Sequence, residues 1–174
     1  NYNYADRYYL GLSYRTDGSS RLARENRWGS FWSVSGAWRF IDESFLNPVK
    51  NVLTDGKLRV SYGVNGTQPS DYYAYMNLYK YGIIYNGQSG MSIVGIANPD
   101  LKWEKNKTWN IGLDLSFIDR ISVTFDYYQR KTSDLIYDLP VSQVGGYYDG
   151  NYGYTTPQNI GSLKNSGFEL TITS

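Results

Sequence analysis

The chain has 174 residues, no Cys, no His and a formal net charge of +1. Without Cys or His it cannot form disulfides, zinc fingers, iron–sulfur sites or catalytic triads that need either residue. The near-zero net charge lacks the basic excess of nucleic-acid-binding proteins, so no nucleic-acid partner is expected. Nineteen Tyr, five Trp and 18 Gly indicate strands and residue types that favour membrane–water interfaces.

Six segments alternate between apolar and polar residues with a period of two, which predicts six β-strands. In the first segment, Tyr8, Leu10 and Leu12 alternate with Tyr9 and Gly11. The polar positions carry mostly Gly, Ser, Asn, Thr, Arg and Asp, which suits a wet or plugged lumen and not a dry core. In chain order, the predicted strands cover residues 7–17, 27–41, 56–67, 101–117, 121–137 and 158–174.

The fourth predicted strand, 101–117, is the most informative because of its length. Strands of soluble proteins average about five or six residues. This segment would reach about 55 Å at roughly 3.3 Å per residue, and close to 40 Å along the membrane normal at a tilt of about 45°. The apolar band of an outer-membrane barrel is only about 25 Å tall, so such a strand can cross a bilayer and project beyond it.

The connections between the predicted strands alternate in character: 118–120 is tight, 42–55 is moderate, 18–26 is short but polar, and 68–100 and 138–157 are long and rich in Tyr, Gly and Asn. Connections 42–55 and 118–120 would lie on the periplasmic side, and 18–26, 68–100 and 138–157 would lie outside the cell. The sequence therefore predicts an all-β fold, a six-stranded antiparallel segment of a transmembrane β-barrel. Six strands cannot enclose a wide lumen, and the chain starts without Met and stops in mid-alternation, so we expect residues 1–174 to be part of one larger barrel domain.

Several phrases of the sequence resemble the SusC/RagA family of TonB-dependent outer-membrane transporters. They occur in family order through almost the whole chain, and only the segments 68–97 and 138–157 depart from the pattern. The phrases include Asp6-Arg7-Tyr8-Tyr9-Leu10, Arg15-Thr16-Asp17-Gly18-Ser19-Ser20-Arg21, Asn26-Arg27-Trp28-Gly29, Asn98-Pro99-Asp100-Leu101-Lys102-Trp103-Glu104 and Gly167-Phe168-Glu169-Leu170.

The resemblance implies a barrel of about 22 strands, closed by a plug domain, of which this chain supplies roughly a quarter of the wall. It implies import of oligosaccharides or peptides across the outer membrane of a Gram-negative bacterium. TonB would supply the energy through the plug, which is absent from this chain, and a SusD-like surface lipoprotein would act as a lid. Two alternatives stay open: a passive or structural outer-membrane barrel, and a secreted Tyr-rich carbohydrate-binding β protein.

Aromatic residues recur on the apolar face and near the ends of the predicted strands. Amphipathic rings gain by lying at the depth of lipid headgroups, where outer-membrane barrels carry aromatic girdles. The alternative is packing against a neighbouring protein. We expect contact with outer-membrane lipid, or a place in such a girdle, for Trp28, Trp32, Trp38, Phe40, Trp103, Trp109 and Phe117.

The two long connections that we expect outside the cell are rich in Tyr beside Asn and Asp. Flat rings with hydrogen-bonding neighbours suit a sugar or peptide substrate, but they equally suit a lid protein, or loops that pack on one another. All three interpretations stay open. The candidate contact residues are Tyr72, Tyr73, Tyr75, Tyr79, Tyr147, Tyr148, Asp149, Tyr152 and Tyr154.

Charged side chains at polar positions are expected to face the lumen, where they either hold the plug by charge-assisted hydrogen bonds or stay solvated. Two carboxylates on adjoining strands could suggest a catalytic pair, but nothing nearby offers a shielded pocket. We therefore predict no catalytic residue, no metal, no cofactor and no enzymatic activity. The predicted lumen- or plug-facing residues are Arg15, Arg27, Arg39, Arg59, Asp114 and Asp126.

Overall fold

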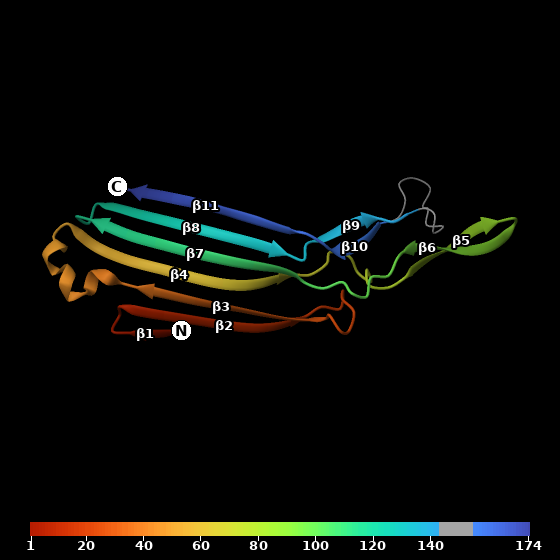
Figure 1. The fold of residues 1–174 in the computed structure, drawn as a ribbon, viewed down its shortest axis with the longest axis horizontal. Coiled ribbons are helices and arrows are strands. Elements are labelled where there is room, and N and C mark those ends of the chain that lie inside the picture. Colours follow the sequence, from red (N-terminus) through yellow and green to blue (C-terminus); the bar gives the residue numbers. More distant parts are fainter. Residues whose placement is uncertain (143–154) are drawn as a thin grey trace.

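The computed structural model describes residues 1–142 and 155–174. Its main body is a seven-stranded antiparallel sheet in the order β1-β2-β3-β4-β7-β8-β11 (Figure 1). These strands are β1 (Tyr2–Tyr4), β2 (Tyr8–Gly18), β3 (Trp28–Trp38), β4 (Leu53–Thr67), β7 (Glu104–Phe117), β8 (Ile121–Ser133) and β11 (Ser162–Thr173).

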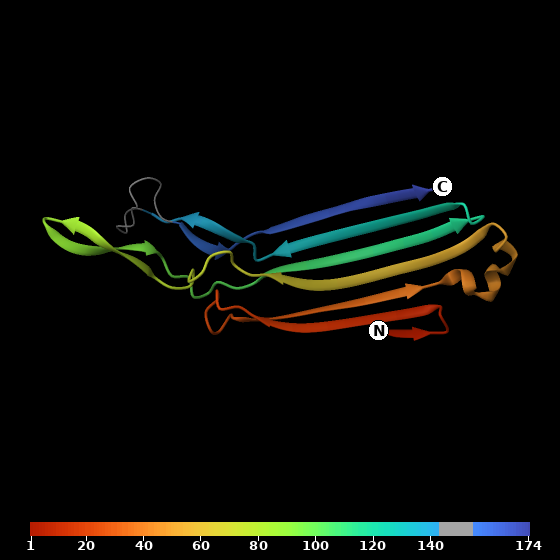
Figure 2. The ribbon, with the colours of Figure 1, turned by 180° about the vertical axis from the view of Figure 1, so that it is seen from behind.

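Two further hairpins extend beyond one end of the main sheet, as Figures 1 and 2 show. They are β5 (Leu78–Tyr85) with β6 (Gln88–Gly95), and β9 (Ile136–Pro140) with β10 (Thr155–Asn159). At the opposite end, two short 3₁₀ helices, η1 (Phe40–Asp42) and η2 (Ser44–Val49), connect β3 to β4. Neither of these, nor any other helix in the described ranges, has the length and apolarity of a membrane-spanning helix.

The six predicted strands correspond to β2, β3, β4, β7, β8 and β11, with corrected ends. The prediction of a strand over 27–41 was too long, because the chain leaves the sheet after Trp38 and turns into η1, where Ile41 is buried. The prediction over 121–137 was also too long. Asp134 has a positive φ of 57°, and the strand breaks there into β8 and β9, which belong to different sheets.

The hairpin β5–β6 was missed, because segment 68–100 was interpreted only as a loop. Its turn contains Asn86 and Gly87, both with positive φ, of 48° and 73°. Asn-Gly between two strand-forming runs is the strongest short-range signal for a two-residue hairpin turn, because both residues tolerate positive φ. This dipeptide was therefore a usable signal in the sequence.

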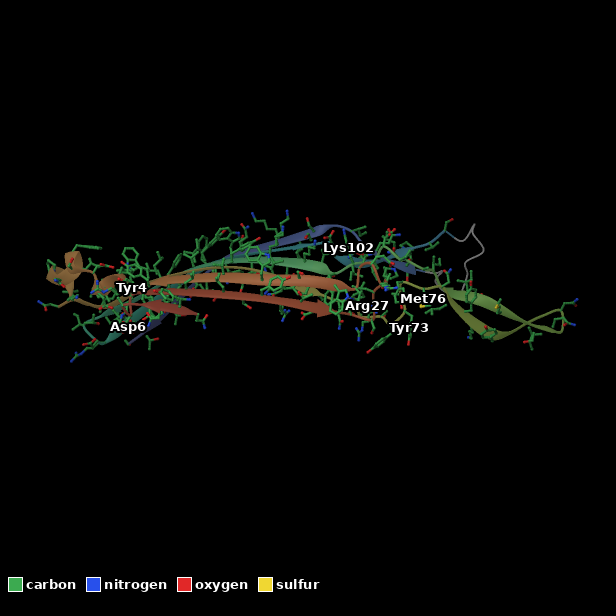
Figure 3. The ribbon with its side chains drawn as sticks, turned by 90° about the horizontal axis from the view of Figure 1, so that it is seen from below. Tyr4, Asp6, Arg27, Tyr73, Met76 and Lys102 are labelled. Carbon is green, nitrogen blue, oxygen red and sulfur yellow. The ribbon has the colours of Figure 1, made fainter. Side chains whose placement is uncertain are left out.

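Register fixes which residues share a face of the main sheet. Leu113 pairs with Leu58 on β4 and with Phe125 on β8, so their side chains lie on one face, called here the apolar face. One residue further along, Asp114 pairs with Lys57 and Thr124 on the opposite, polar face. Figure 3 shows the sheet edge-on, with side chains projecting from both faces. The alternation predicted from sequence is thus the alternation of the two faces.

The end of the sheet that carries η1 and η2 has tight turns. Ala5 and Asp6 join β1 to β2 with positive φ, and Ile118 and Asp119 do so between β7 and β8. Each turn is closed by a backbone hydrogen bond, from Arg7 to Tyr4 at 3.1 Å in the first and from Arg120 to Phe117 at 3.0 Å in the second. This end, called here the turn end, is the short-loop side that the sequence analysis assigned to the periplasm.

Glu43, between η1 and η2, ties the turn end together. Its carboxylate accepts hydrogen bonds from the Tyr8 hydroxyl at 2.5 Å and the Trp38 indole at 3.2 Å, and lies 3.6 Å from the Arg7 guanidinium. Tyr8 and Trp38 are partners in the β2–β3 register, so both side chains lie on the apolar face. The hydrogen bond from Tyr8, followed by that from Trp38, lowers the pKa of Glu43 below its ordinary value.

A second cluster anchors the opposite end, called here the loop end. Leu22, Phe31, Leu101 and Trp103 form a buried core, with Ala74 and Ile136 packed against it. The Phe31 and Trp103 rings meet edge to face at 5.4 Å, and the Trp103 indole donates to the Arg27 carbonyl oxygen at 3.1 Å. The bases of connections 19–27, 68–77 and 101–103 therefore share one apolar core instead of projecting separately into solvent.

Replacing Glu43 with Gln is expected to remove one acid-sensitive contribution to stability. Because the folded-state pKa of Glu43 is lowered, its contribution is present above the ordinary pKa of Glu and is lost as the pH falls through the lowered value. The melting temperature of the whole detergent-solubilised protein, measured from pH 7 to pH 3, should fall less in E43Q than in wild type. The exposed Glu25 has no ion pair or side-chain hydrogen bond among the described residues, so the control E25Q should keep the wild-type pH dependence.

Replacing Trp103 with Ala should loosen the loop end, because removing a buried Trp costs about 3–5 kcal/mol. Trypsin cleavage of the membrane-embedded protein after the exposed Arg24 should become at least about tenfold faster, since cleavage needs local opening. The control Trp28→Ala removes a ring that is 69% exposed, and should leave this rate unchanged within about twofold. Equal rates in W103A and wild type would contradict the anchoring role.

Candidate functional site

The apolar face carries a run of aromatic rings across three strands. Trp32 on β3 lies 5.4 Å from Tyr62 on β4, and Tyr62 lies 5.1 Å from Trp109 on β7, measured between ring centroids. Trp32 and Trp109 are nonetheless 44% and 47% exposed. The rings therefore contact one another along the sheet while their outer surfaces stay open, as in a girdle at a membrane interface.

Much of the rest of this face is equally open. Large apolar side chains on β2, β4, β7, β8 and β11 are exposed, with no layer of protein over them among residues 1–142 and 155–174. A soluble protein rarely exposes apolar surface on this scale, so the face requires an apolar environment. Its exposed members include Leu10, Leu12, Val60, Ile111, Ile121, Phe125, Phe168, Leu170 and Ile172.

Six of the seven predicted girdle residues are associated with the apolar face. Trp28, Trp32, Trp38, Trp109 and Phe117 belong to it by register. Phe40 is in η1 instead of a strand. Its ring contacts Trp38 at 5.9 Å and covers Gly56, where an added Cβ would collide with it, so Phe40 still lies over the apolar face.

Trp103 is the exception, and its predicted lipid contact is wrong. It precedes β7, is only 9% exposed, and packs in the core of the loop end described above. β7 begins at Glu104, so Trp103 lies outside the strand and the alternation of faces does not extend to it. Counting alternate residues back from Trp109 therefore does not predict on which side of the sheet Trp103 lies. Trp103 is an anchor for the loops and not part of a girdle.

The polar face has an ion-pair network at Arg59. The Arg59 guanidinium donates to both carboxylate oxygens of Asp114, at 2.6 and 3.0 Å, and to Asp126 at 3.0 Å. These three side chains come from β4, β7 and β8, and each is about one third exposed. Gly112 makes the room, because a Cβ there would overlap both the guanidinium and the Asp126 carboxylate. Both carboxylates are thus engaged in ion pairs with Arg59, an arrangement typical of a structural network.

The other predicted lumen-facing arginines are dispersed. Arg15, on the polar face of β2, pairs with Asp17 at 3.1 Å and lies over the Phe31 ring at 5.5 Å. Arg39 has left the strand, and at the turn end it contacts Asp42 and Asp55 at 3.3 and 3.2 Å. Arg27 precedes β3, and its Nε is buried without a hydrogen-bond partner among the described residues. The sheet therefore does not gather these cations into one site.

A groove of about 480 Å³ runs over the polar face of β2, β3, β4 and β7. Its floor consists largely of small or short side chains, among them Gly11, Ser35, Ser61 and Gly112, and Arg59 stands at its side. Residues this small let another polypeptide approach the sheet closely. The groove is therefore a surface on which a second element of the protein could rest.

The Tyr-rich segment 72–79 lies between the main sheet and the β5–β6 hairpin. Tyr72 and Tyr73 are 63% and 57% exposed, and their ring centroids are 6.4 Å apart. The Arg21 guanidinium lies 4.2 Å from the Tyr72 ring and donates to the carbonyl oxygens of Pro69 and Ser70, both at 2.8 Å. Connection 19–27 thus helps to fix the orientation of Tyr72.

A shallow pocket of about 310 Å³ lies beside these rings, between the bases of the two outer hairpins. Tyr72 and Met76 from the first segment line it together with Asp138 and Pro157 from β9 and β10. Tyr79 is on β5 and 48% exposed, and Tyr75 is partly buried. The predicted contact residues Tyr147, Tyr148, Asp149, Tyr152 and Tyr154 lie outside the described residues.

Within residues 1–142 and 155–174, no group of three or more acidic side chains is placed to hold a metal ion. One feature of the apolar face was not predicted from the sequence, namely that four of its positions on β7, β8 and β11 are Lys. Positions 105, 107, 131 and 164 each continue the alternate apolar positions of their strand. Counting every second residue along these strands would have placed the four lysines on the apolar face.

Comparison with known proteins agrees with this architecture. The family model described as TonB dependent receptor-like, beta-barrel matches residues 1–174. The TonB-dependent receptor SusC of Bacteroides thetaiotaomicron is 40% identical over 183 residues, covering 99% of this chain and 17% of the relative. The TonB-dependent receptor P39 of Formosa agariphila is 35% identical over 174 residues, covering 98% of this chain and 16% of the relative. The chain thus spans about a sixth of the length of these curated relatives.

Solved structures match the fold as well as the sequence. A structure of the RagAB peptide transporter superposes with a TM-score of 0.85 at 34% identity, covering 99% of this chain and 18% of that one. The RagAB peptide importer in its open-open state gives a TM-score of 0.84 at 32% identity, with the same coverage of both chains. The predicted all-β barrel segment and the resemblance to SusC/RagA are therefore confirmed. The chain belongs to the TonB-dependent receptor-like β-barrel family, and its main sheet is a segment of the barrel wall.

Proposed function

We propose that this chain forms wall and outer-loop structure in a TonB-dependent transporter that imports large nutrients, oligosaccharides or peptides. The observation that supports this most strongly is the family match along the whole chain, together with the 40% identity to SusC and the superposition on RagAB. Receptors of this family are outer-membrane proteins of Gram-negative bacteria, and the family is a transporter family and not an enzyme class. The two alternatives, a passive barrel and a secreted lectin-like protein, are not favoured by these matches.

The proposal includes what lies outside this chain. Residues 1–174 would be part of one barrel domain, with the other strands and the plug supplied by the rest of the polypeptide. A SusD-like lipoprotein would cover the loop end, and TonB would act on the plug. Sequencing the gene on either side tests this directly: it should encode a plug domain and about sixteen more strands.

The two faces of the sheet would have different surroundings. The apolar face would contact lipid, because its large apolar side chains stay exposed in the described parts of the chain. The polar face would line the lumen, and the plug would rest in the groove beside Arg59, where close approach is possible and charge-assisted hydrogen bonds are available. The tight turns at one end would lie in the periplasm.

Spin labels on two neighbouring residues test this orientation. Val60 is on the apolar face and Ser61 on the polar face, and this chain has no Cys that would compete for the label. In the whole protein, cleared of any other Cys and reconstituted in lipid, a label on V60C should collide more with oxygen than with a water-soluble nickel complex. A label on S61C should show a lower ratio of oxygen to nickel collisions. The reverse order would contradict the proposed orientation.

At the loop end, we propose that Tyr72, Tyr73, Tyr75 and Tyr79 contact substrate or lid. Tyr72, Tyr73 and Tyr79 are exposed, Arg21 stacks on Tyr72, and Ala74 packs the segment against the buried core. Aromatic rings held in one orientation lose little conformational entropy on binding, which favours them as contact residues. The adjoining pocket supplies apolar and carboxylate groups at the same place.

The double substitution Y72A/Y73A is expected to reduce uptake of the transported nutrient, or affinity for the lid, by about tenfold, since buried interface aromatics often contribute more than 1 kcal/mol each. Tyr4→Ala is the matched control, because Tyr4 is equally exposed at 60% but lies at the turn end, as Figure 3 shows. Unchanged uptake and unchanged lid affinity in Y72A/Y73A would remove these residues from the site.

Wild-type uptake should also stop when the proton gradient is dissipated. Uptake that persists without the gradient would indicate a passive barrel.

A further inference from the structure

The four lysines on the apolar face form a row close to the loop end. Lys107 on β7 is the register partner of Lys131 on β8, and Lys131 is the partner of Lys164 on β11. Lys105 lies two residues further out on β7, at the next position on the same face, and pairs with Ser133. All four side chains are exposed, and none has an ion pair among residues 1–142 and 155–174.

This arrangement is unfavourable for the isolated sheet. Directly opposed residues of an antiparallel pair have Cβ atoms about 4.5–5.5 Å apart, and like charges at that spacing repel. Lys131 has such a neighbour on each side. By contrast, Arg59 on the polar face has two carboxylate partners, Asp114 and Asp126. A ligand with several negative charges would convert this repulsion into attraction.

The position of the row along the strands indicates which ligand reaches it. Lys107 is ten residues from Phe117, the last residue of β7 at the turn end. Ten residues span about 33 Å of strand, or about 24 Å along the normal at a tilt near 45°. The apolar band of an outer-membrane barrel is about 25 Å tall, so the lysines would lie where the outer-leaflet hydrocarbon ends and the headgroups begin.

Neighbouring residues agree with this depth. On β4 and β3, the register partners that continue the Lys107 position are Val64 and Trp32, and Trp32 belongs to the aromatic run described above. The same level of the wall is thus aromatic on the β2–β3 side and basic on the β7–β11 side. Aromatic rings and basic side chains are the two residue types that favour the boundary between hydrocarbon and anionic headgroups.

We propose that Lys107, Lys131 and Lys164, with Lys105 beside them, bind the phosphate groups of a phosphorylated glycolipid of the outer leaflet, of the lipid A class. The acyl chains would lie along the apolar face below the row, against residues such as Tyr127 and Phe168, whose rings contact each other at 5.0 Å. Lysine is well suited to this role, since its flexible stem lets the ammonium adjust to phosphates at slightly different heights.

The test uses the whole purified transporter in detergent, with lipid A added and its dissociation constant measured by native mass spectrometry. The triple variant K107Q/K131Q/K164Q should bind lipid A about 100-fold more weakly, on the basis of about fivefold per basic side chain near an anionic surface. The charge-retaining variant K107R/K131R/K164R should bind like wild type. Should the triple variant fail to fold, the single change K131Q should weaken binding about fivefold on the same basis.

A matched control removes three positive charges elsewhere. Lys50 and Arg120 lie at the turn end and Lys80 lies on β5, and all three are exposed. The variant K50Q/K80Q/R120Q should retain wild-type affinity for lipid A. Equal weakening in this control would show that net charge alone is responsible, and would overturn the site.

Two further ligands identify the source of the phosphate. Enzymatically dephosphorylated lipid A should bind at least about tenfold more weakly than lipid A, because most of the attraction is to phosphate. Inorganic phosphate at millimolar concentration should not displace lipid A, because it lacks acyl chains. Unchanged binding in K107Q/K131Q/K164Q, equal binding of dephosphorylated lipid A, or complete displacement by inorganic phosphate would each overturn the proposal. The result does not depend on nutrient uptake, so it stands or fails separately from the transport function.

Discussion

The structure depends on one constraint, which is that a sheet whose two faces meet lipid and water must alternate its side chains without interruption while every backbone group stays paired. Hydrocarbon cannot hydrogen-bond an unpaired N–H or C=O group, so the central strands pair along most of their length. The β4–β7 register continues from Leu53 to Thr67 with a single irregularity near Asp55. A slip of one residue would exchange the faces and move Arg59 and Asp114 onto the apolar face, so register and chemistry are fixed together.

The same constraint explains how much the sequence could predict. Within the paired part of the strands most residues follow the period of two, so the strands and the faces of Arg59, Asp126, Trp32 and Trp109 follow from counting alternate residues. Where the chain leaves the sheet, counting fails. Trp103 appears to continue the series of β7, yet it turns inward, because at the loop end the chain can bury an aromatic ring in a local core instead of presenting it to lipid.

At the ends of the sheet, one feature could be predicted from a short sequence pattern and another could not. The Asn86-Gly87 turn was readable from two residues, because positive φ at both positions favours these residue types. The Glu43 contacts were not readable, since they depend on a 3₁₀ segment folding back over the apolar face to reach Tyr8 and Trp38. Such contacts join residues far apart in sequence without any period, and only the three-dimensional arrangement brings them together.

The two clusters of charged side chains on the wall differ in where their counter-charges lie. On the polar face, Arg59 is balanced within the protein by two carboxylates, and Gly112 leaves the space for all three groups. On the apolar face, the row around Lys131 has no carboxylate partner among the described residues, although each lysine replaces a side chain that the strand pattern would make apolar. A wall can keep like charges in register only where something outside it supplies the counter-charge. On the proposed orientation, that requirement would connect the lysine row to anionic headgroups of the outer leaflet, and the Arg59 network would face the lumen.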